Sequence, residues 1–224
     1  MLSLSTLSPL VLFTSVALAG NAHPWKYANN PIVKQTSPNS LTITTPPATD
    51  LWHPSAAPQN FTSPYVYKVC KSADFQRVSV TLSADFKTRY DQGGIAIFFP
   101  NKKDANSKTG PESWLKTGIE FEKGAPQLGT VGNYKFSDWS LAPVVPEGAK
   151  EGTFLVERNG TELWSYHVVN NDRYPLREVT WAFLEERGKK DAELWVGLYA
   201  AKPTYNENPK EKLSVDFKDI EIVC

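Results

Sequence analysis

The stretch WLKTGIEFE (residues 114–122) places an aromatic ring, an ammonium group and two carboxylates at alternating positions. Alternate side chains of a β-strand point to the same face, so Lys116, Glu120 and Glu122 would share one face with the indole of Trp114. Two carboxylates at this spacing could act as the acid pair of a glycosidase. Their mutual repulsion would raise the pKa of one carboxyl group, as general acid catalysis requires.

Three interpretations of this polar face remain open. In the first, Glu120 is the catalytic carboxylate of a glycoside hydrolase. In the second, the face binds a carbohydrate without turning it over, because an aromatic ring can stack on a sugar while Lys116, Glu120 and Glu122 bind its hydroxyl groups. Gly118 would then leave a notch that a ligand can approach closely. In the third, the face is solvated and its charges pair only weakly.

Four further residues are candidates for the margins of the same site. Asp91 and Gln92 precede Gly-Gly at the start of an apolar segment, where they could line a pocket or form an Asx-type turn. Trp139, in the polar string SDWS, either caps the core or stacks on a ligand. Arg158 lies next to an Asn-Gly turn and could pair with a carboxylate of the polar strand, or remain solvated.

The strands that would carry these residues are predicted from the period-two alternation that runs through most of the chain after Pro64. The predicted strands are Tyr65–Cys70, Gln76–Ala84, Gly93–Phe99, Trp114–Glu122, Leu128–Phe136, Gly152–Arg158, Thr161–Val168, Val179–Glu186, Glu193–Ala200 and Leu213–Val223. Asn159-Gly160 separates two of them and favours a tight hairpin turn. No segment shows a sustained helical period, so the sequence predicts an all-β fold, an antiparallel β-sandwich.

The chain before these strands divides into two predicted regions. Residues 1–19 hold a short apolar run that ends in Ala-Leu-Ala, which is typical of a secretory signal peptide. Residues 20–64 are rich in proline and predict an extended segment laid over the surface of a sandwich domain formed by residues 65–224. Within that segment SLTITT (residues 40–45) could pair as an edge strand.

Two cysteines and two acceptor sequons agree with secretion. Cys70 and Cys224 each end a strand-like segment, and in an oxidising compartment they would form a disulfide, the alternative being two buried thiols. Asn60 and Asn159 each begin an Asn-x-Thr sequon and are predicted glycosylation sites. The sequence therefore predicts a secreted, extracellular glycoprotein.

Several function classes are disfavoured by composition. The formal net charge is +0, so the chain carries no electrostatic signature of nucleic-acid or anionic-membrane binding. After the N-terminal run no segment is long and apolar enough for a transmembrane helix. The cysteines and histidines lack metal-ligand spacing, and no dense Asp/Asn loop indicates calcium, so no metal and no cofactor is expected. The oligomeric state is not predicted.

Six strings in a fixed order carry a resemblance to a known family. They are YDQGG (90–94), WLKTGIE (114–120), SDWS (137–140), VERNG (156–160), WVGLYAAKP (195–203) and VDFKDIEI (215–222). Over residues 50 to 223 the chain is similar to the enolase-regulation-protein-like family of unknown function, whose members resemble the concanavalin A-like lectin/glucanase jelly roll. The resemblance implies two curved antiparallel sheets with a concave outer face. The apparent signal peptide departs from the member named for an influence on enolase, an intracellular enzyme.

The resemblance also bears on catalysis. Glucanases of this superfamily place a nucleophile, a helper carboxylate and an acid on one strand, as Glu-x-Asp-x-Glu or with one residue more. Here Glu120 and Glu122 match the first two positions, but the third falls at Gly124 or Ala125, which cannot protonate a leaving group. The function expected from the sequence is therefore non-catalytic carbohydrate binding. The alternatives are a glycoside hydrolase that uses Glu120 and a protein-interaction or regulatory module.

Overall fold

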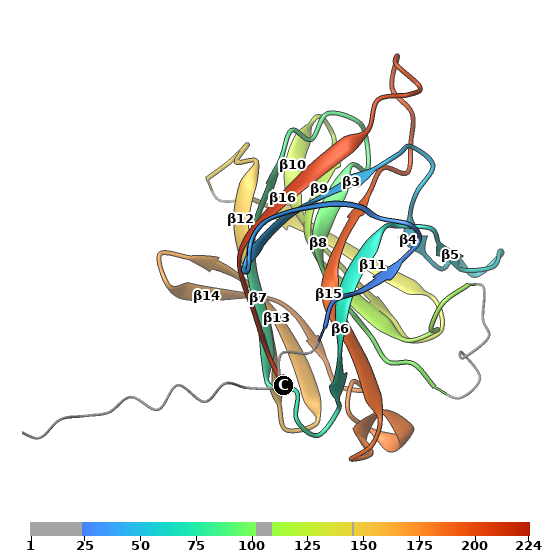
Figure 1. Cartoon of the computed structure of the whole chain (residues 1–224), viewed down its shortest axis with the longest axis vertical. Helices are drawn as coiled ribbons and strands as arrows, with labels where there is room; N and C mark the ends of the chain where they lie inside the picture. The colour runs from blue at the N-terminus through green and yellow to red at the C-terminus, as the bar shows by residue number, and fades with distance from the viewer. Residues whose placement is uncertain (1–23, 102–108, 145) are drawn as a thin grey trace, which may run out of the picture.

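The computed structural model describes residues 24–224, apart from 102–108 and 145. Two seven-stranded antiparallel sheets pack face to face as a sandwich, which confirms the predicted fold class (Figure 1). The predicted signal peptide, residues 1–19, lies outside the described residues. Within the described chain no helix has the length and apolar character needed to cross a membrane.

Sheet A has the strand order β1-β6-β15-β8-β9-β10-β11. Its strands are β1 (Lys26–Ala28), β6 (Tyr65–Lys71), β15 (Glu193–Ala201), β8 (Gln92–Phe98), β9 (Trp114–Glu122), β10 (Ala125–Asn133) and β11 (Ser137–Pro143). The predicted polar strand is therefore β9, with the predicted bounds, at an interior position of the sheet.

Sheet B has the strand order β14-β13-β12-β7-β16-β3-β2. Its strands are β14 (Asp172–Val179), β13 (Glu162–Val169), β12 (Glu151–Asn159), β7 (Arg77–Ala84), β16 (Leu213–Val223), β3 (Ser40–Thr45) and β2 (Ile32–Ser37). A third, two-stranded sheet pairs β4 (Leu51–Trp52) with β5 (Asn60–Phe61). A single 3-10 helix, η2 (Glu185–Gly188), is described between β14 and β15.

The core lies between the two sheets and follows from the period-two alternation. On β9, Leu115 and Ile119 are buried in the main apolar cluster, so the alternate residues Lys116 and Glu120 point away from sheet B. On β7 the inward residues are equally regular, with Val78, Val80 and Leu82 all buried. The polar face of β9 is therefore the outer face of sheet A.

The proline-rich N-terminal segment is not a layer outside the sandwich. Its strands extend both sheets, because β1 pairs with β6 and β3 pairs with β16. The boundary predicted at residues 64 and 65 therefore does not separate the segment from the sheets. SLTITT forms β3, which has β2 on its other side and is not an edge strand. The reason is its alternation, since Leu41, Ile43 and Thr45 are all buried.

Two local predictions are wrong. The predicted strand 179–186 is mostly turn, because Phe183 is buried beside Phe75 and Phe99 at the end of the sandwich. The strand lies earlier, as β14, whose Pro175 is tolerated at the edge of sheet B. SDWS lies outside all the strands predicted from the sequence, but it begins β11.

One disulfide links the two sheets. Cys70 and Cys224 form the predicted disulfide, with 5.8 Å between their Cα atoms. It joins the end region of β6 in sheet A to the residue after β16 in sheet B.

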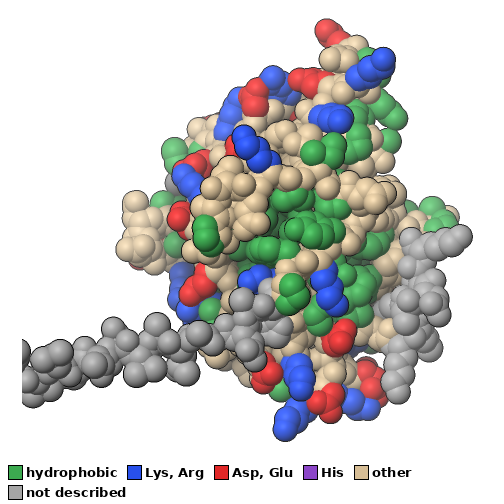
Figure 2. Space-filling model, viewed as in Figure 1, with side chains coloured by type: hydrophobic (Ala, Val, Ile, Leu, Met, Phe, Trp, Pro, Cys, Tyr) green, Lys and Arg blue, Asp and Glu red, His purple; other side chains and the backbone are tan. Residues whose placement is uncertain are grey.

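On the face shown in Figure 2, Lys and Arg side chains are interspersed with Asp and Glu, as expected from a formal net charge of +0.

Candidate functional site

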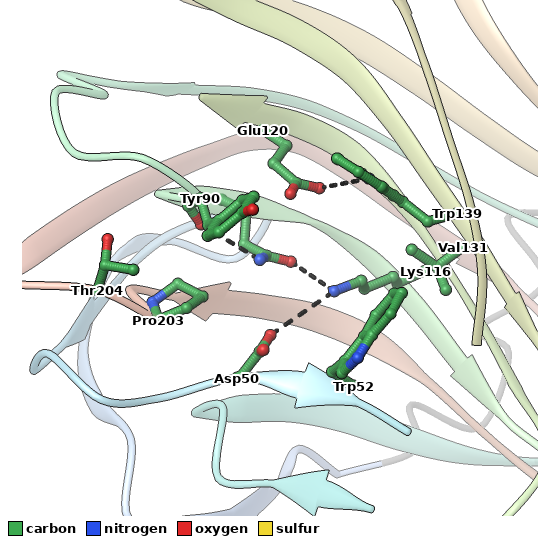
Figure 3. Close-up of a pocket in the computed structure, with 10 residues that line it drawn as sticks. Asp50, Trp52, Tyr90, Lys116, Glu120, Val131, Trp139, Pro203 and Thr204 are labelled. Atoms are coloured by element: carbon green, nitrogen blue, oxygen red, sulfur yellow. Dashed lines mark hydrogen bonds and ion pairs between the residues drawn. The ribbon is translucent and has the colours of Figure 1, made fainter. Parts of the chain in front are cut away.

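A pocket of about 360 Å³ lies on the outer face of sheet A (Figure 3). It is lined by Asp50, Trp52, Tyr90, Gln92, Lys116, Glu120, Val131, Trp139, Pro203 and Thr204. The floor comes from β8, β9, β10 and β11, whose outward residues Lys116, Val131 and Trp139 are register partners across the sheet. The walls come from segments outside these strands. The volume is at the small end of the range for ligand sites, about 300–1,000 Å³.

Lys116 lies at the centre of the floor and is only 3% exposed. Its Nζ donates hydrogen bonds to the carbonyl oxygen of Leu51 at 2.8 Å and to Oε1 of Gln92 at 2.7 Å. Oδ1 of Asp50 lies 3.9 Å from the same nitrogen, which completes an ion pair. Because a buried ammonium is costly without partners, these contacts hold the charge at a defined place in the pocket.

Glu120 lies two outward positions further along β9, beyond Gly118, and is 6% exposed. Its Oε2 accepts a hydrogen bond from Nε1 of Trp139 at 3.2 Å, and Figure 3 shows the carboxyl group facing the space between Tyr90 and Trp139. Burial raises the pKa of the Glu120 carboxyl group, while Lys116 and the Trp139 hydrogen bond oppose the rise. The nearby charge of Asp50 adds to the rise, so two carboxyl groups from distant parts of the chain influence each other here.

Between the Lys116 row and the Glu120 row the floor is made of glycine. Gly94, Gly118 and Gly129 are consecutive register partners on β8, β9 and β10. A Cβ at Gly118 would lie 2.0 Å from the carbonyl oxygen of Gly93, and a Cβ at Gly129 would lie 3.0 Å from Oε2 of Glu120. The notch predicted at Gly118 therefore admits the backbone of the neighbouring strand, whereas Gly129 makes room for the Glu120 side chain.

The wall formed by Asp50 and Trp52 comes from the β4–β5 hairpin. The carbonyl oxygen of Asp50 accepts hydrogen bonds from the backbone nitrogens of Thr62 and Ser63 at 2.9 and 3.0 Å, which closes the hairpin. His53, the residue after Trp52, docks on Ser137 of β11. The backbone nitrogen of His53 donates to Oγ of Ser137 at 2.8 Å, and the backbone nitrogen of Ser137 donates to the carbonyl oxygen of His53 at 2.9 Å. These residues were not predicted, because nothing in a proline-rich segment indicates which strand it will cover.

The same hairpin covers the end of β9. Nε1 of Trp114 donates to Oε1 of Gln59 at 2.9 Å, and both side chains are buried. Trp114 therefore shares the outward face of β9 with Lys116, as predicted, but it lies beneath the hairpin and does not line the pocket. Of the two tryptophans that sequence analysis placed at the site, the one that lines the pocket is Trp139, which is 39% exposed.

Tyr90 forms the wall opposite Trp139, and its backbone has a φ of +68°. This left-handed conformation is rare for a bulky side chain. It is held by a hydrogen bond from the Tyr90 nitrogen to the carbonyl oxygen of Phe121 at 2.7 Å. The ring meets Trp139 edge to face, with 6.3 Å between centroids, and carries the guanidinium of Arg89 at 4.6 Å on its face. Tyr90 was not predicted, although it precedes two residues that were.

Four of the predicted binding residues come together in the pocket, namely Gln92, Lys116, Glu120 and Trp139. Glu122 shares the outward face of β9 with Glu120, but it does not line the pocket because its Oε2 accepts a hydrogen bond from Nε of Arg89 at 2.9 Å. The acid pair proposed from the period-two spacing is therefore not assembled around the pocket.

Asp91 and Arg158 lie elsewhere. Asp91 follows the turn interpretation, since its Oδ2 accepts from the backbone nitrogens of Lys87 and Thr88, and its Oδ1 pairs with Nζ of buried Lys202 at 3.1 Å. Arg158 lies on β12 of the other sheet, where its guanidinium covers the ring of Phe183 at 4.1 Å. Arg158 was predicted to lie at the margin of the site because it adjoins a hairpin turn. A turn motif does not specify which sheet the hairpin joins.

The sequence matches, over residues 27–223, the family described as "Protein of unknown function (DUF1349)". The chain belongs to the DUF1349 family. An uncharacterized protein of Emericella nidulans is 39% identical over 168 residues, which cover 75% of this chain and 79% of that protein. The family description makes no reference to enolase, so the enolase association implied by the sequence resemblance is not confirmed.

Solved structures show the same fold as this DUF1349 chain. A functionally unknown protein from Saccharomyces cerevisiae has a TM-score of 0.69 at 20% identity, covering 88% of this chain and 95% of that one. A mutant of the GH43 protein BlXynB from Bacillus licheniformis has a TM-score of 0.63 at 16% identity, and the match covers 89% of this chain but only 36% of that one. An alginate lyase from Klebsiella pneumoniae has a TM-score of 0.51 at 9% identity, with coverage of 85% and 83%.

The DUF1349 pocket contains no metal-binding arrangement. Across residues 24–101, 109–144 and 146–224, no three His, Cys, Asp or Glu side chains are grouped to bind a metal ion. The chemistry that the pocket offers is therefore that of two carboxyl groups, one ammonium, one amide and the three aromatic rings of Trp52, Tyr90 and Trp139.

Proposed function

We propose that the pocket on sheet A binds a carbohydrate without chemical conversion. The observation that carries this proposal is the combination of three aromatic rings, from Trp52, Tyr90 and Trp139, around the hydrogen-bonding groups of Lys116 and Glu120. Sugar rings have an apolar face that stacks on aromatic side chains and hydroxyl groups at their edges that bond carboxylates and amides. Both kinds of partner converge in this pocket.

The fixed geometry of the polar groups supports the same function. Gln92 bridges the floor and the wall, because its Oε1 accepts from Lys116 and its Nε2 donates to the carbonyl oxygen of Tyr90 at 3.2 Å. On the other side of the pocket, the hydrogen bond from Nε1 of Trp139 to Oε2 of Glu120 fixes both of these side chains. A site whose side chains are already ordered loses less conformational entropy when a ligand binds.

The solved structures of similar fold include a glycoside hydrolase family protein and an alginate lyase, which supports a carbohydrate ligand by analogy of fold. We place this binding outside the cell. The Cys70–Cys224 disulfide supports that location, since such bonds persist in oxidising compartments. The sequons at Asn60 and Asn159 agree with it, because both asparagines are exposed.

A binding screen tests the proposal. The full chain, produced with its disulfide, is applied to an array of glycans and cell-wall polysaccharides, and hits are confirmed by calorimetry. Binding is expected, and Trp139→Ala is expected to abolish or strongly weaken it, whereas Trp164→Ala, which alters a partly buried tryptophan of sheet B, is not. Absence of any hit would contradict the proposal and favour a protein-interaction module.

A second candidate function, glycoside hydrolysis, is favoured by one observation. Asp50, which immediately precedes β4, brings a second carboxylate into the pocket of Glu120, whose pKa is raised by burial as a general acid requires. Release of reducing ends from oligosaccharides would support hydrolysis. Glu120→Gln must then abolish the release, and an activity that survives this substitution would exclude Glu120 as the catalytic residue.

A further inference from the structure

The charged groups that face the pocket come from three residues, Asp50, Lys116 and Glu120. Lys116 has three N–H groups. Two of them donate to Leu51 and Gln92, and the carboxylate of Asp50 lies 3.9 Å from the nitrogen. Among the residues that the structure describes, the third N–H group has no acceptor within hydrogen-bonding distance, but the positive charge of the ammonium is balanced by the Asp50 carboxylate. A ligand anion would have to compete with Asp50 for this charge.

The cations next to the pocket are committed in the same way. Arg89 stands on the outer side of the Tyr90 ring, and its Nε donates to Glu122 at 2.9 Å. Lys202, which precedes the lining residue Pro203, is 2% exposed and donates to Thr88 and Asp91 at 2.7 and 3.1 Å. Neither Arg89 nor Lys202 lines the pocket, so the one cation among its described lining residues is Lys116, which is paired with Asp50.

The two carboxyl groups of the pocket differ from these cations, because each uses only one of its two oxygens for contacts with the described residues of the protein. Asp50 uses Oδ1 for the backbone nitrogen of Leu51 and for Lys116, and Glu120 uses Oε2 for Trp139. In the described part of the chain, Oδ2 of Asp50 and Oε1 of Glu120 accept no hydrogen bond. They are acceptors for ligand hydroxyl groups. With both acids ionised the pocket carries a formal charge of −1, and with Glu120 protonated it carries 0, so in neither state is it positive.

Building on the proposed carbohydrate-binding function, we infer that this pocket selects uncharged sugar units and rejects uronic acids and sulfated sugars. Neutral sugars present hydroxyl donors to Asp50 and Glu120 and an apolar face to Trp52 and Trp139. An anionic substituent meets two carboxyl groups and a single ammonium that is already paired with Asp50, and such like-charge placement costs binding energy. The rejection operates at close range, because the groups are inside the pocket where solvent screens them less.

The test compares three ligand sets by calorimetry on the full, disulfide-bonded chain. The first contains neutral gluco-, manno- and xylo-oligosaccharides, the second contains oligogalacturonates and alginate oligomers, and the third contains glucosamine oligomers. The best neutral ligand is expected to bind about tenfold or more tightly than any uronate. Its affinity is expected to be the same at low and high salt. Tighter binding of a uronate than of a neutral or a glucosamine oligomer would overturn the inference.

Variants separate this inference from the binding function itself. Asp50→Asn removes one negative charge from the wall and is expected to reduce the discrimination against uronates about threefold or more, whereas Asp172→Asn, on exposed β14, leaves it unchanged. Discrimination that is insensitive to Asp50→Asn would overturn the charge argument while leaving carbohydrate binding intact. Failure of all three ligand sets to bind would instead overturn the proposed function.

Discussion

The indole of Trp139 donates a hydrogen bond to Oε2 of Glu120 at 3.2 Å, joining β11 to β9 across the intervening β10. This contact unites two residues that sequence analysis identified separately as candidates. Trp139 therefore has two roles, because the same side chain lines the pocket and orients the carboxyl group of Glu120. The following predictions begin with these two residues.

Substitution of Glu120 is expected to change the pH dependence of stability. Burial raises the pKa of this carboxyl group in the folded protein, so its favourable contribution is present below the ordinary glutamate pKa and is lost as pH rises through the folded value. Glu120→Gln removes the ionisation but keeps an oxygen for Trp139. The free energy of unfolding of this variant, relative to wild type, is therefore expected to be higher at pH 7 than at pH 4. Urea unfolding at a series of pH values checks this, and a relative stability that falls with pH would contradict it.

Trp139 can be dissected by two substitutions. Trp139→Phe retains an aromatic face but loses the N–H that Glu120 accepts, whereas Trp139→Ala loses both. Loss of the ring is expected to weaken glycan binding about tenfold or more, and loss of the hydrogen bond alone by less. Because Trp139 is 39% exposed, both variants should remain folded. Equal affinities of Trp139→Ala and wild type, measured by calorimetry, would exclude this residue from the site.

The Asp91–Lys202 pair is expected to act on stability. Both side chains are 2% exposed and 3.1 Å apart, so removal of one charge leaves the other buried without its partner. Asp91→Asn is expected to lower the free energy of unfolding by about 3–5 kcal/mol. The control is Asp85→Asn, since Asp85 forms exposed ion pairs with Lys87 and Lys150 and its replacement should have little effect. Similar denaturant midpoints for the two variants would refute the structural role of Asp91.

The row of Gly94, Gly118 and Gly129 in the pocket floor leads to a prediction about close packing. Gly118→Ala would place a Cβ 2.0 Å from a backbone oxygen, where no flexible side chain can yield, and is expected to cost about 3 kcal/mol of stability. Gly132→Ala, also in sheet A, meets only Nη1 of Arg177 at 3.6 Å and should be nearly neutral. Thermal unfolding of both variants checks the difference. Comparable melting temperatures would show that β8 and β9 can separate without cost.

The disulfide is expected to contribute substantially because it closes a loop of 154 residues. In the chain-entropy description, a loop of this size corresponds to a loss of about 5 kcal/mol when the bond is removed. Cys70→Ala combined with Cys224→Ala should therefore lower the free energy of unfolding by about that amount. Reductant should destabilise the wild type and leave the double variant unaffected. A wild type insensitive to reductant would contradict the prediction.

Much of the fold could be predicted, and the reason is periodicity. Strand β9 was predicted with its bounds because Leu115 and Ile119 alternate with polar residues over its whole length. The segment around Phe183 was misassigned because aromatic residues that pack at the end of a sandwich can imitate an alternating strand. The strand β14 was predicted too late in the chain, because Pro175 suggests a break in a strand, although an edge strand tolerates proline.

About half of the candidate site could be predicted from the sequence. Lys116 and Glu120 follow from one strand, whose alternation is a local property. Asp50 and Trp52 reach the pocket through a hairpin that docks on β11, and such docking depends on tertiary contacts that leave no local pattern. Arg158 was misplaced for a related reason, since a turn motif specifies a hairpin but not the sheet that it joins.

The pairing of β3 with β16 has a consequence for how the protein is made. Oγ1 of Thr42 donates to Asp216, a partner 174 residues later in the chain, so an early strand completes its ladder only after the last strand has been synthesised. Contacts of such long sequence separation slow folding, and they leave the unpaired edge of β3 accessible during translation. Asp50 and Trp52 follow β3 directly, so the pocket wall is translated early but assembled late. Until β16 is synthesised, the edge of β3 that it will cover stays open to pairing with other strands.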